Sequence, residues 1–474
     1  MPVTTAYKAE TAHAALGENF YDAVAPAEFP KAVVRHRNQR WAARVGLDGL
    51  SDAEWITHFA RFQALPDGLP APLALRYHGH QFRSYNSELG DGRGFLFAQL
   101  RDAADGRLLD LGTKGSGVTP WSRRGDGRLT LKGGMREILA TEMLEALGVD
   151  TSRSFSLVET GEALQRNDEP SPTRASVLVR LSHSHIRIGT FQRLAYHDDK
   201  AGIARLLDHV IAYYFPQLAD EPQEQRAAAF FSEVCARVAK LGAQYMAAGF
   251  VHGVLNSDNI NVTGESFDYG PWRFAPTHDP NFVAAYFDYS GLYSFGRQPG
   301  ALHWNLERLA ECLLPMISLS AAQKALDGFG DSVKRAYREA LFKRLALKPA
   351  GEAEDVALAK AVVAFLIEQR APFEQFFFDW RGGLASSARA RASSAAPFYA
   401  GEAFEATLRA FEAHESAENA RLDHPYFRQQ EPCLMLIDDV EAIWAPIAES
   451  DDWSAFHAKL DRIAQMRDAL GRAD

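Results

Sequence analysis

The sequence is poor in cysteine and lacks long apolar runs. Its only three cysteines among 474 residues, Cys235, Cys312 and Cys433, lie far apart and form no C-x-x-C pair, so neither a disulfide framework nor a zinc ribbon is expected. The N-terminal segment carries Lys8 and Glu18 where a secretory signal would be apolar. No later run reaches about 18 uncharged apolar residues, the length that a membrane helix needs. These absences predict a cytoplasmic protein of a reducing compartment, without a membrane partner.

An excess of basic residues is also missing. Lysine and arginine number 51 against 61 aspartate and glutamate residues, which gives a net charge of −10. A protein of this charge is not expected to bind nucleic acid through general phosphate contacts. Hydrophobic residues make up 47% and charged residues 24%, as is usual in a globular protein. The length allows about two to four compact units.

Strand-like segments concentrate in the first half of the chain. Four strands are predicted from apolar runs bounded by turn residues, at residues 95–100, 108–115, 152–159 and 175–181. The first two are separated by a short polar turn and predict a hairpin. Between the two pairs, apolar residues at helical spacing from Met135 to Leu147, followed by Gly148, predict a helix.

Helical patterns dominate the remainder. Residues 20–85 predict a helical lead-in, and the chain beyond Gly189 is mainly helical, with one long helix over 224–248. Aromatic residues at 373–380 predict helix packing in a core, whereas the serine- and alanine-rich stretch 386–397 predicts a surface loop. The pattern is that of an α+β protein in which a strand-rich region precedes a helix-rich region.

The segment from Val251 to Pro271 contains the spacing of a magnesium-nucleotide site. Asn259 and Asp268, the latter within Asp-Tyr-Gly, correspond to the asparagine and the Asp-Phe-Gly aspartate with which protein kinases hold magnesium. Kinases place their catalytic aspartate five residues before the asparagine. That position is Val254 here, which cannot accept a proton, so conventional phosphoryl transfer is not expected.

The strand-rich region offers the other half of such a site. Lys114 ends the second predicted strand and Glu137 lies early in the following helix, the arrangement of the ion pair that fixes a lysine beside phosphates in kinases. The LGDGRG segment at 89–94 supplies backbone amides that can approach an anion closely, and Arg93 adds a positive charge.

Together these segments resemble one family, selenoprotein O, the YdiU group of protein adenylyltransferases with a protein-kinase-like fold. The shared blocks are GHQF at 79–82, LGDGRG at 89–94, GTKGSG at 112–117, SRRGDGR at 122–128, RE at 136–137, SHSHIRIGTF at 182–191, HGVLNSDN at 252–259, DYGP at 268–271 and YSFGRQP at 293–299. The resemblance implies a two-lobed protein-kinase-like α+β fold. Its expected parts are an N-terminal extension at 1–85, a strand-rich nucleotide-binding N-lobe at 86–188 and an enlarged helical C-lobe at 189–474.

The resemblance also implies a reaction and a set of residues. AMP would pass from ATP to serine, threonine or tyrosine hydroxyls of proteins, this protein included, and pyrophosphate would leave. ATP would bind in reverse, with its α-phosphate toward the acceptor. Asp258 would accept the hydroxyl proton, and Asn259 and Asp268 would bind Mg²⁺, or Mn²⁺ in its place. The implied nucleotide-binding residues are Gly90, Gly92, Arg93, Lys114, Asp126, Gly127, Glu137, Arg180, Arg187 and Asp268. We expect a monomer.

Two other functions are compatible with the motifs. In the first, Asp258 serves the transfer of the γ-phosphate, and the protein is an atypical kinase. In the second, the lack of a base at Val254 makes the protein a catalytically silent, ATP-binding pseudokinase scaffold. The chain also departs from the family at Arg83, which replaces the small residue usual after GHQF, so we expect a different substrate-facing surface.

Overall fold

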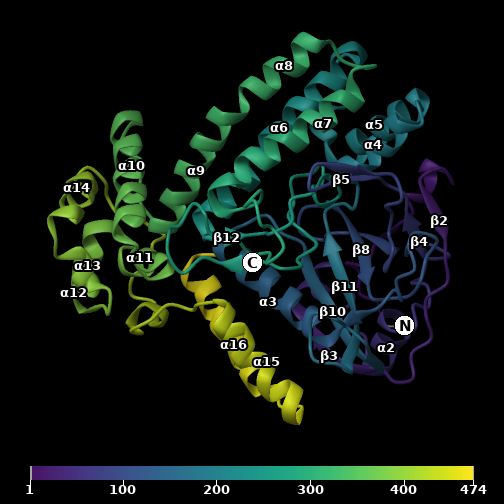
Figure 1. Ribbon diagram of the computed structural model, residues 1–474, viewed down its shortest axis with the longest axis horizontal. Helices are drawn as coiled ribbons and strands as arrows, with labels where there is room; N and C mark the ends of the chain where they lie inside the picture. The colour runs from purple at the N-terminus through teal and green to yellow at the C-terminus, as the bar shows by residue number, and fades with distance from the viewer. Residues whose placement is uncertain (1–2, 473–474) are drawn as a thin grey trace.

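The computed structural model describes residues 3–472 and has a strand-rich N-terminal region followed by a helical C-terminal region. Figure 1 shows the sheet and the helix α3 (Leu131–Leu147) on one side, and most of the later helices above and beside them. The α+β fold predicted from the pattern, with strands before helices, is confirmed.

The four predicted strands form the centre of a nine-stranded antiparallel sheet. They are β7 (Leu96–Arg101), β8 (Leu108–Lys114), β10 (Arg153–Leu164) and β11 (Thr173–Ser182), in the order β7-β8-β11-β10. The register pairs Leu178 with Lys114 and Arg180 with Gly112. Because residues two apart share a face of a sheet, Lys114 and Arg180 lie on the same face, diagonally across two neighbouring strands.

The prediction of a helical lead-in over residues 20–85 is wrong. This segment contains only two short helices, α1 (Gln39–Arg44) and α2 (Asp52–Phe59). Its strands are β2 (Tyr21–Ala23), β3 (Val33–Arg37), β4 (Leu73–Leu75), β5 (Gly79–Gln81) and β6 (Ser84–Asn86). Most are three residues long, too short to show a period of two. Moreover, β3 pairs with β10, far along the chain, and a single-sequence pattern does not reveal such pairing. The sheet is completed by β1 (Ala9–Glu10), which pairs with β7, and β9 (Leu129–Thr130), which pairs with β11.

Helix α3 confirms the helix predicted around 135–147. It begins four residues earlier than predicted because the hydroxyl of Thr130 accepts a hydrogen bond from the Gly133 amide and caps the first turn. It ends where Gly148 adopts a left-handed conformation with φ of 82°. The helix packs against β10 and β11, and this fixes Glu137 beneath the sheet.

The C-terminal region consists of helices joined by irregular segments. The helices are α4 (Ile188–Tyr196), α5 (Lys200–Tyr214), α6 (Gln223–Ala248), α7 (Gln298–Leu313), α8 (Leu319–Asp327), α9 (Phe329–Leu345), α10 (Glu352–Gln369), α11 (Phe373–Asp379), α12 (Ser387–Ala392), α13 (Ala396–Tyr399), α14 (Glu402–Phe411), α15 (Ile437–Ser450) and α16 (Ser454–Ala469). Helix α6 confirms the long helix predicted over 224–248. The aromatic side chains of α11 are buried, as the prediction of core packing requires. None of the helices within residues 3–472 is long and apolar enough to span a bilayer.

The stretch 386–397 lies mostly at the surface, as predicted, but the prediction of a loop is wrong, because α12 covers 387–392 and α13 begins at Ala396. Alanine and arginine favour helix, and the Arg389 side chain anchors α12 by donating hydrogen bonds to the carbonyls of Asp379 and Arg381. The helices were missed because each is only one or two turns long.

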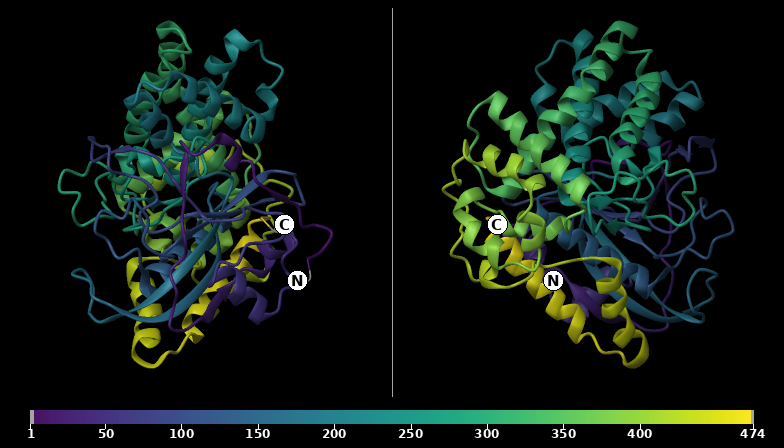
Figure 2. Two further views of the ribbon diagram at one scale, coloured as in Figure 1. Left: turned by 90° about the vertical axis from the view of Figure 1, so that its right-hand side faces the viewer. Right: turned by 60° about the vertical axis from the view of Figure 1, so that its left-hand side comes forward.

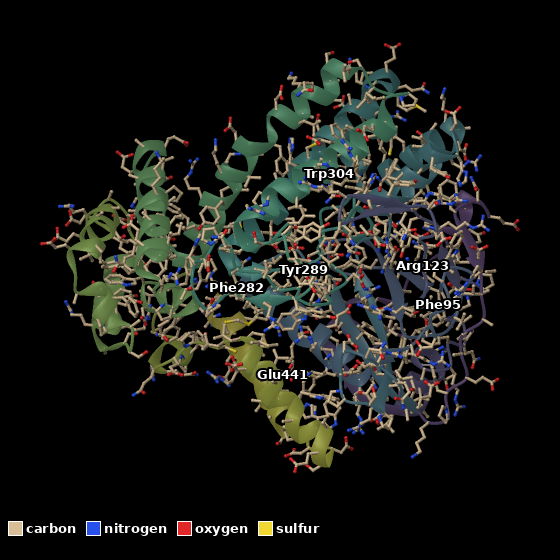
Figure 3. All side chains as sticks on the ribbon, viewed as in Figure 1. Phe95, Arg123, Phe282, Tyr289, Trp304 and Glu441 are labelled. Carbon is tan, nitrogen blue, oxygen red and sulfur yellow. The ribbon has the colours of Figure 1, made fainter. Side chains whose placement is uncertain are left out.

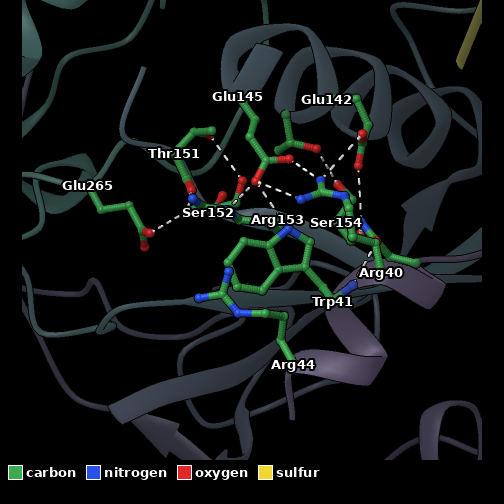
Figure 4. A network of polar contacts seen from close by, with 12 residues as sticks. Arg40, Trp41, Arg44, Glu142, Glu145, Thr151, Ser152, Arg153, Ser154 and Glu265 are labelled. Atoms are coloured by element: carbon green, nitrogen blue, oxygen red, sulfur yellow. Dashed lines mark hydrogen bonds and ion pairs between the residues drawn. The ribbon is translucent and has the colours of Figure 1, made fainter. Parts of the chain in front are cut away.

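The last two helices return to the strand-rich region. Figures 1 and 2 show α15 and α16 lying along its lower side, with α16 beside α3. Arg467 of α16 donates to Glu142 at 3.0 Å and to Glu145 at 3.4 Å, both on α3. Glu145 also accepts hydrogen bonds from Arg40, Trp41 and Arg153 (Figure 4). Burial raises the pKa of Glu145, but Arg153 and Arg40 outweigh it and hold the pKa below its usual value.

We expect Glu145→Ala to lower the thermal unfolding temperature strongly. The pair of Glu145 with Arg153 is mostly buried, and removing one partner of such a pair costs up to about 3 kcal/mol, because Arg153 loses a carboxylate that compensates its charge. Glu441→Ala is the matched control, because Glu441 (labelled in Figure 3) also joins the C-terminal helices to α3, through Lys132, but is largely exposed. Its loss is expected to cost less than about 1 kcal/mol. An equal drop in unfolding temperature in the two variants would show that the contacts of Glu145 do not stabilise the fold in the way proposed.

Candidate functional site

A cavity of about 740 Å³ lies where the sheet, the glycine-rich loop and the segment after β12 (Phe250–Val251) meet. Its walls contain all but one of the residues that the sequence analysis assigned to nucleotide binding, metal binding or proton acceptance. The residues brought together are Gly90, Gly92, Arg93, Lys114, Asp126, Gly127, Arg180, Arg187, Asp258, Asn259 and Asp268. The exception is Glu137, which lies behind the cavity wall and reaches it through Lys114.

Four charged side chains meet at the inner end of the cavity; Lys114, Arg180 and Asp268 line it, and Glu137 lies directly behind them. Lys114 Nζ lies 2.7 Å from Glu137 Oε2 and 2.9 Å from Asp268 Oδ1. Arg180 Nη1 lies 2.9 Å from the same Asp268 oxygen and 3.4 Å from Glu137 Oε1. The ion pair expected between Lys114 and Glu137 is therefore present, and both of its members are buried.

Asp268 is strongly held in its ionised form. Burial raises its pKa, but the charges of Lys114, Arg180 and Arg93 outweigh burial and keep the pKa well below its usual value. Its backbone has a φ of 62°, a left-handed conformation that is uncommon outside glycine, asparagine and aspartate. The Asp-Tyr-Gly turn thus aims a permanently charged carboxylate at the two cations.

The short 3₁₀ helix at Ser257–Asn259 carries the second carboxylate. The side-chain amide of Asn259 donates to the Val254 carbonyl at 3.1 Å, which fixes the asparagine in the cavity wall and leaves its Oδ1 to accept. Asp258 is buried, and its Oδ1 has no hydrogen-bond partner within the part of the chain that the structure describes. Burial raises the pKa of Asp258 to about 6; Arg187 opposes this rise and Asp268 adds to it.

Arg187 links the 3₁₀ helix at Ser257–Asn259 to the glycine-rich loop. Its guanidinium donates to the Asp258 carbonyl at 3.3 Å, lies 3.5 Å from Asp91 Oδ1, and stacks over the Tyr77 ring at 4.1 Å. The side chain is buried. These contacts keep a fixed positive charge beside Asp258.

The glycine-rich loop is interlocked with the segment 119–127. A side chain at Gly90 would place its Cβ 2.4 Å from the Trp121 ring, and one at Gly92 would lie 2.7 Å from the Trp121 carbonyl oxygen. The Ser122 hydroxyl donates to the Gly92 carbonyl at 2.5 Å, and the Thr119 hydroxyl to the Asp91 carbonyl at 2.6 Å. Close packing is thus a second reason for glycine here, beside the approach of an anion.

The cavity is far more basic than the chain as a whole. Eight of its lining side chains are cationic and four are carboxylates, in a protein whose net charge is −10. Sequence reasoning missed four of these cations, which are Arg123, Arg124, Arg128 and Arg166. Three belong to the SRRGDGR block, where only Asp126 and Gly127 were assigned. The fourth enters from the β10–β11 connection to pair with Asp126 at 2.8 Å, and nothing in its sequence context marks it.

The sequence of this chain matches known proteins over almost its whole length. The sequence model of the family described as protein adenylyltransferase SelO matches residues 3–464. A protein nucleotidyltransferase YdiU from Synechocystis sp. is 44% identical over 472 residues, covering 96% of this chain and 97% of the relative. The protein of that name from Gloeobacter violaceus is 44% identical, with coverages of 96% and 94%. One from Rhodopseudomonas palustris is 40% identical, with coverages of 79% and 76%.

Among solved structures, a rhoptry antigen kinase domain of Toxoplasma gondii aligns with 57% of this chain and 81% of its own. The TM-score is 0.29 and the identity 12%, values too low to bear on the fold.

Gly90→Ala is expected to disturb the cavity more than a comparable glycine substitution nearby. Because the new methyl group meets the Trp121 ring, the segment 119–127 must shift, at a cost of about 1–3 kcal/mol. Gly270→Ala is the matched control, since a Cβ there meets nothing within 4 Å. Thermal unfolding and calorimetric titration with ATP measure both effects. If the Gly90→Ala and Gly270→Ala proteins have the same unfolding temperature and the same ATP affinity, the proposed close packing of Gly90 against Trp121 is wrong.

Proposed function

Because the chain belongs to the SelO family of protein adenylyltransferases, we propose that its cavity binds ATP in reverse and transfers AMP to protein hydroxyls, with Asp258 as the proton acceptor. Membership makes the protein a nucleotidyltransferase that uses ATP and acts on proteins. The proposal adds the residue roles, the orientation of the nucleotide and the serine, threonine or tyrosine acceptors. The observation that carries it is the buried Asp258 carboxylate, whose Oδ1 has no hydrogen-bond partner among residues 3–472, at the wall of a cationic cavity.

Asp258 takes the role that Val254 cannot fill. In the proposed step the acceptor hydroxyl oxygen bonds to the α-phosphorus, the bond from that phosphorus to the bridging oxygen of the β-phosphate breaks, and pyrophosphate leaves with both electrons of that bond. The hydroxyl proton passes to Asp258. A carboxylate whose Oδ1 is buried without a partner has a strong tendency to accept such a proton, and Arg187 keeps its backbone in place.

The inner wall provides the charge that the leaving group needs. Pyrophosphate carries more negative charge than AMP, so fixed cations near it favour departure. Lys114 and Arg180 are buried at the sheet end of the cavity, and Arg187 and Arg93 complete the set. These positions suit the β- and γ-phosphates, and the α-phosphate then faces Asp258. In the free protein Asp268 pairs with Lys114 and Arg180, which keeps these buried cations compensated until ATP arrives.

The donor set fits a magnesium ion. Mg²⁺ prefers oxygen ligands and is held by one or two carboxylates together with substrate phosphates. Asp268 contributes carboxylate oxygens, and Asn259 is oriented with its amide nitrogen bound to Val254, so its oxygen is available. Asn259 and Asp268 would hold Mg²⁺, or Mn²⁺ in its place, and the bound ion would neutralise phosphate charge.

ATP labelled separately at the α- and γ-phosphates tests the proposed transfer. We expect α-label in the acceptor protein and no γ-label, with a mass increase of one AMP by intact-mass spectrometry. Transfer of γ-label would identify an atypical kinase instead, and ATP binding without either label would identify a silent scaffold.

Asp258→Asn should slow transfer while leaving ATP binding largely unchanged. The amide has the size of the carboxylate but cannot accept the proton, and loss of a general base typically costs about 10²- to 10⁴-fold in rate. Asp208→Asn, on the exposed surface of α5 and outside the cavity, is the control. Single-turnover rates with α-labelled ATP measure the effect. Wild-type rates in Asp258→Asn would exclude the assigned role.

Arg180→Ala and Arg187→Ala should each weaken ATP binding by about tenfold or more, because a charge-assisted contact contributes about 1.5–3 kcal/mol. AMP, which lacks the β- and γ-phosphates, should bind weakly to the wild-type protein and change little in the variants. Arg174→Ala serves as the control. Arg174 lies on β11, as Arg180 does, but its side chain pairs with Glu159 and Asp451 away from the cavity. Equal losses of ATP and AMP affinity, measured by calorimetry, would show that the arginines support the adenosine or the fold instead.

A further inference from the structure

Three exposed arginines flank the mouth of the cavity without an ion-pair partner. Arg123 and Arg124 line the cavity from the 119–127 segment, and Arg83 lies at the tip of the β5–β6 hairpin. Across residues 3–472, no ion pair includes any of the three; the Arg83 guanidinium lies over the ring of Trp304 at 5.5 Å. Figure 3 labels Arg123 and Trp304.

The β5–β6 hairpin is fixed to the catalytic segment. The His80 amide donates to the Ser257 hydroxyl at 2.7 Å, and the Phe82 amide donates to Asn256 Oδ1 at 3.0 Å. A side chain at Gly79 would come within 2.9 Å of Asp258 Oδ1. The hairpin therefore packs directly on the residue that faces the acceptor hydroxyl, and Arg83 projects from its turn.

The backbone holds these arginines in unusual conformations. Phe82 and Arg83 have φ of 48° and 65°, and Arg123 and Arg124 have φ of 46° and 69°. Two successive positive φ angles in a hairpin turn normally call for Asn-Gly or Gly-Gly. Bulky residues held in this region tend to occur at functional sites, so the turn and the 119–127 segment present their arginines in defined positions.

The surroundings of the mouth suit a protein partner. Tyr286 and Tyr289 are 76% and 92% exposed, and Phe287, also exposed, packs its ring on Phe82 at 5.9 Å. Figure 3 labels Tyr289. Exposed aromatic side chains that cluster in this way mark surfaces for macromolecules. Through the Phe82–Phe287 contact, exposed aromatic area thus lies next to the turn that carries Arg83.

We propose that the mouth of the cavity recognises protein segments in which acidic residues flank the acceptor hydroxyl. The inference rests on the proposed AMP transfer and adds the class of acceptor. Arg83 does not line the cavity, so the binding of a nucleotide in the cavity does not explain the position of Arg83. A chain with net charge −10 repels acidic partners in general, and a local positive mouth therefore orients an acidic segment toward Asp258.

The test uses peptides that share one acceptor serine and differ only in flanks of glutamate, glutamine or lysine, with α-labelled ATP. The variant is the double charge reversal Arg83→Glu with Arg124→Glu, one residue from each side of the mouth. Arg123 is kept because its charge also acts on Asp258. The control reversal is Arg335→Glu with Lys360→Glu, two exposed cations on α9 and α10 outside this cavity.

We expect the wild-type protein and the control to favour the glutamate peptide over the glutamine peptide by about tenfold in kcat/KM, and 0.5 M salt to reduce the preference. The double variant should favour the lysine peptide. Thermal unfolding and ATP titration establish that the double variant is folded.

An unchanged preference in the folded double variant would overturn the inference. Casein serves as a general protein acceptor in the same assay, and a wild-type protein that labels casein but discriminates among none of the peptides would also overturn the inference. If ATP affinity falls while the peptide preference stays, the arginines serve the nucleotide and the inference is also wrong. A double variant that fails to fold is replaced by Arg83→Glu alone, for which a preference unchanged from wild type counts against the inference. A wild-type protein that labels neither casein, the peptides nor itself would instead refute the proposed AMP transfer.

Discussion

The ion-pair cluster of the buried Lys114, Glu137 and Arg180 with the partly exposed Asp268 is the interaction on which the rest of the site depends. Two cations and two carboxylates meet at distances between 2.7 and 3.4 Å. They come from two strands, the helix beneath them and the Asp-Tyr-Gly turn. Burying any one of these charges alone would be costly. The sheet, α3 and the C-terminal region must therefore come together for the cluster to form, and its formation places Asp268 in the cavity.

Much of this site could be predicted from spacing alone. Lys114 at a strand end and Glu137 early in a helix form the expected pair because both elements carry strong local patterns. Asn259 and Asp268 share a cavity wall with Lys114. Asp258, next to Asn259, was identified through the family resemblance, and its lack of a hydrogen-bond partner became visible only in the structure.

The missed features have a common physical origin. The strands within residues 20–85 are short, and some, such as β3 with β10, pair with partners far along the chain, so local periodicity carries little information about them. Arg166 reaches the cavity only because it pairs with Asp126, which is 40 residues away. The helices at 386–397 depend on contacts such as those of Arg389 with α11 and Arg381. In these cases contacts between elements, which a local pattern does not record, contribute to the structure.

The C-terminal hairpin of α15 and α16 bears on how a nucleotide reaches its site. Arg467 joins α16 to α3, and Asp451, after α15, pairs with Arg35 and Arg174 of the sheet. A hinge motion that separates the two regions would have to break these contacts together. Because the glycine-rich loop and the 119–127 segment are interlocked through Trp121, neither can shift far without displacing the other, and any widening of the cavity on this side would require both to move.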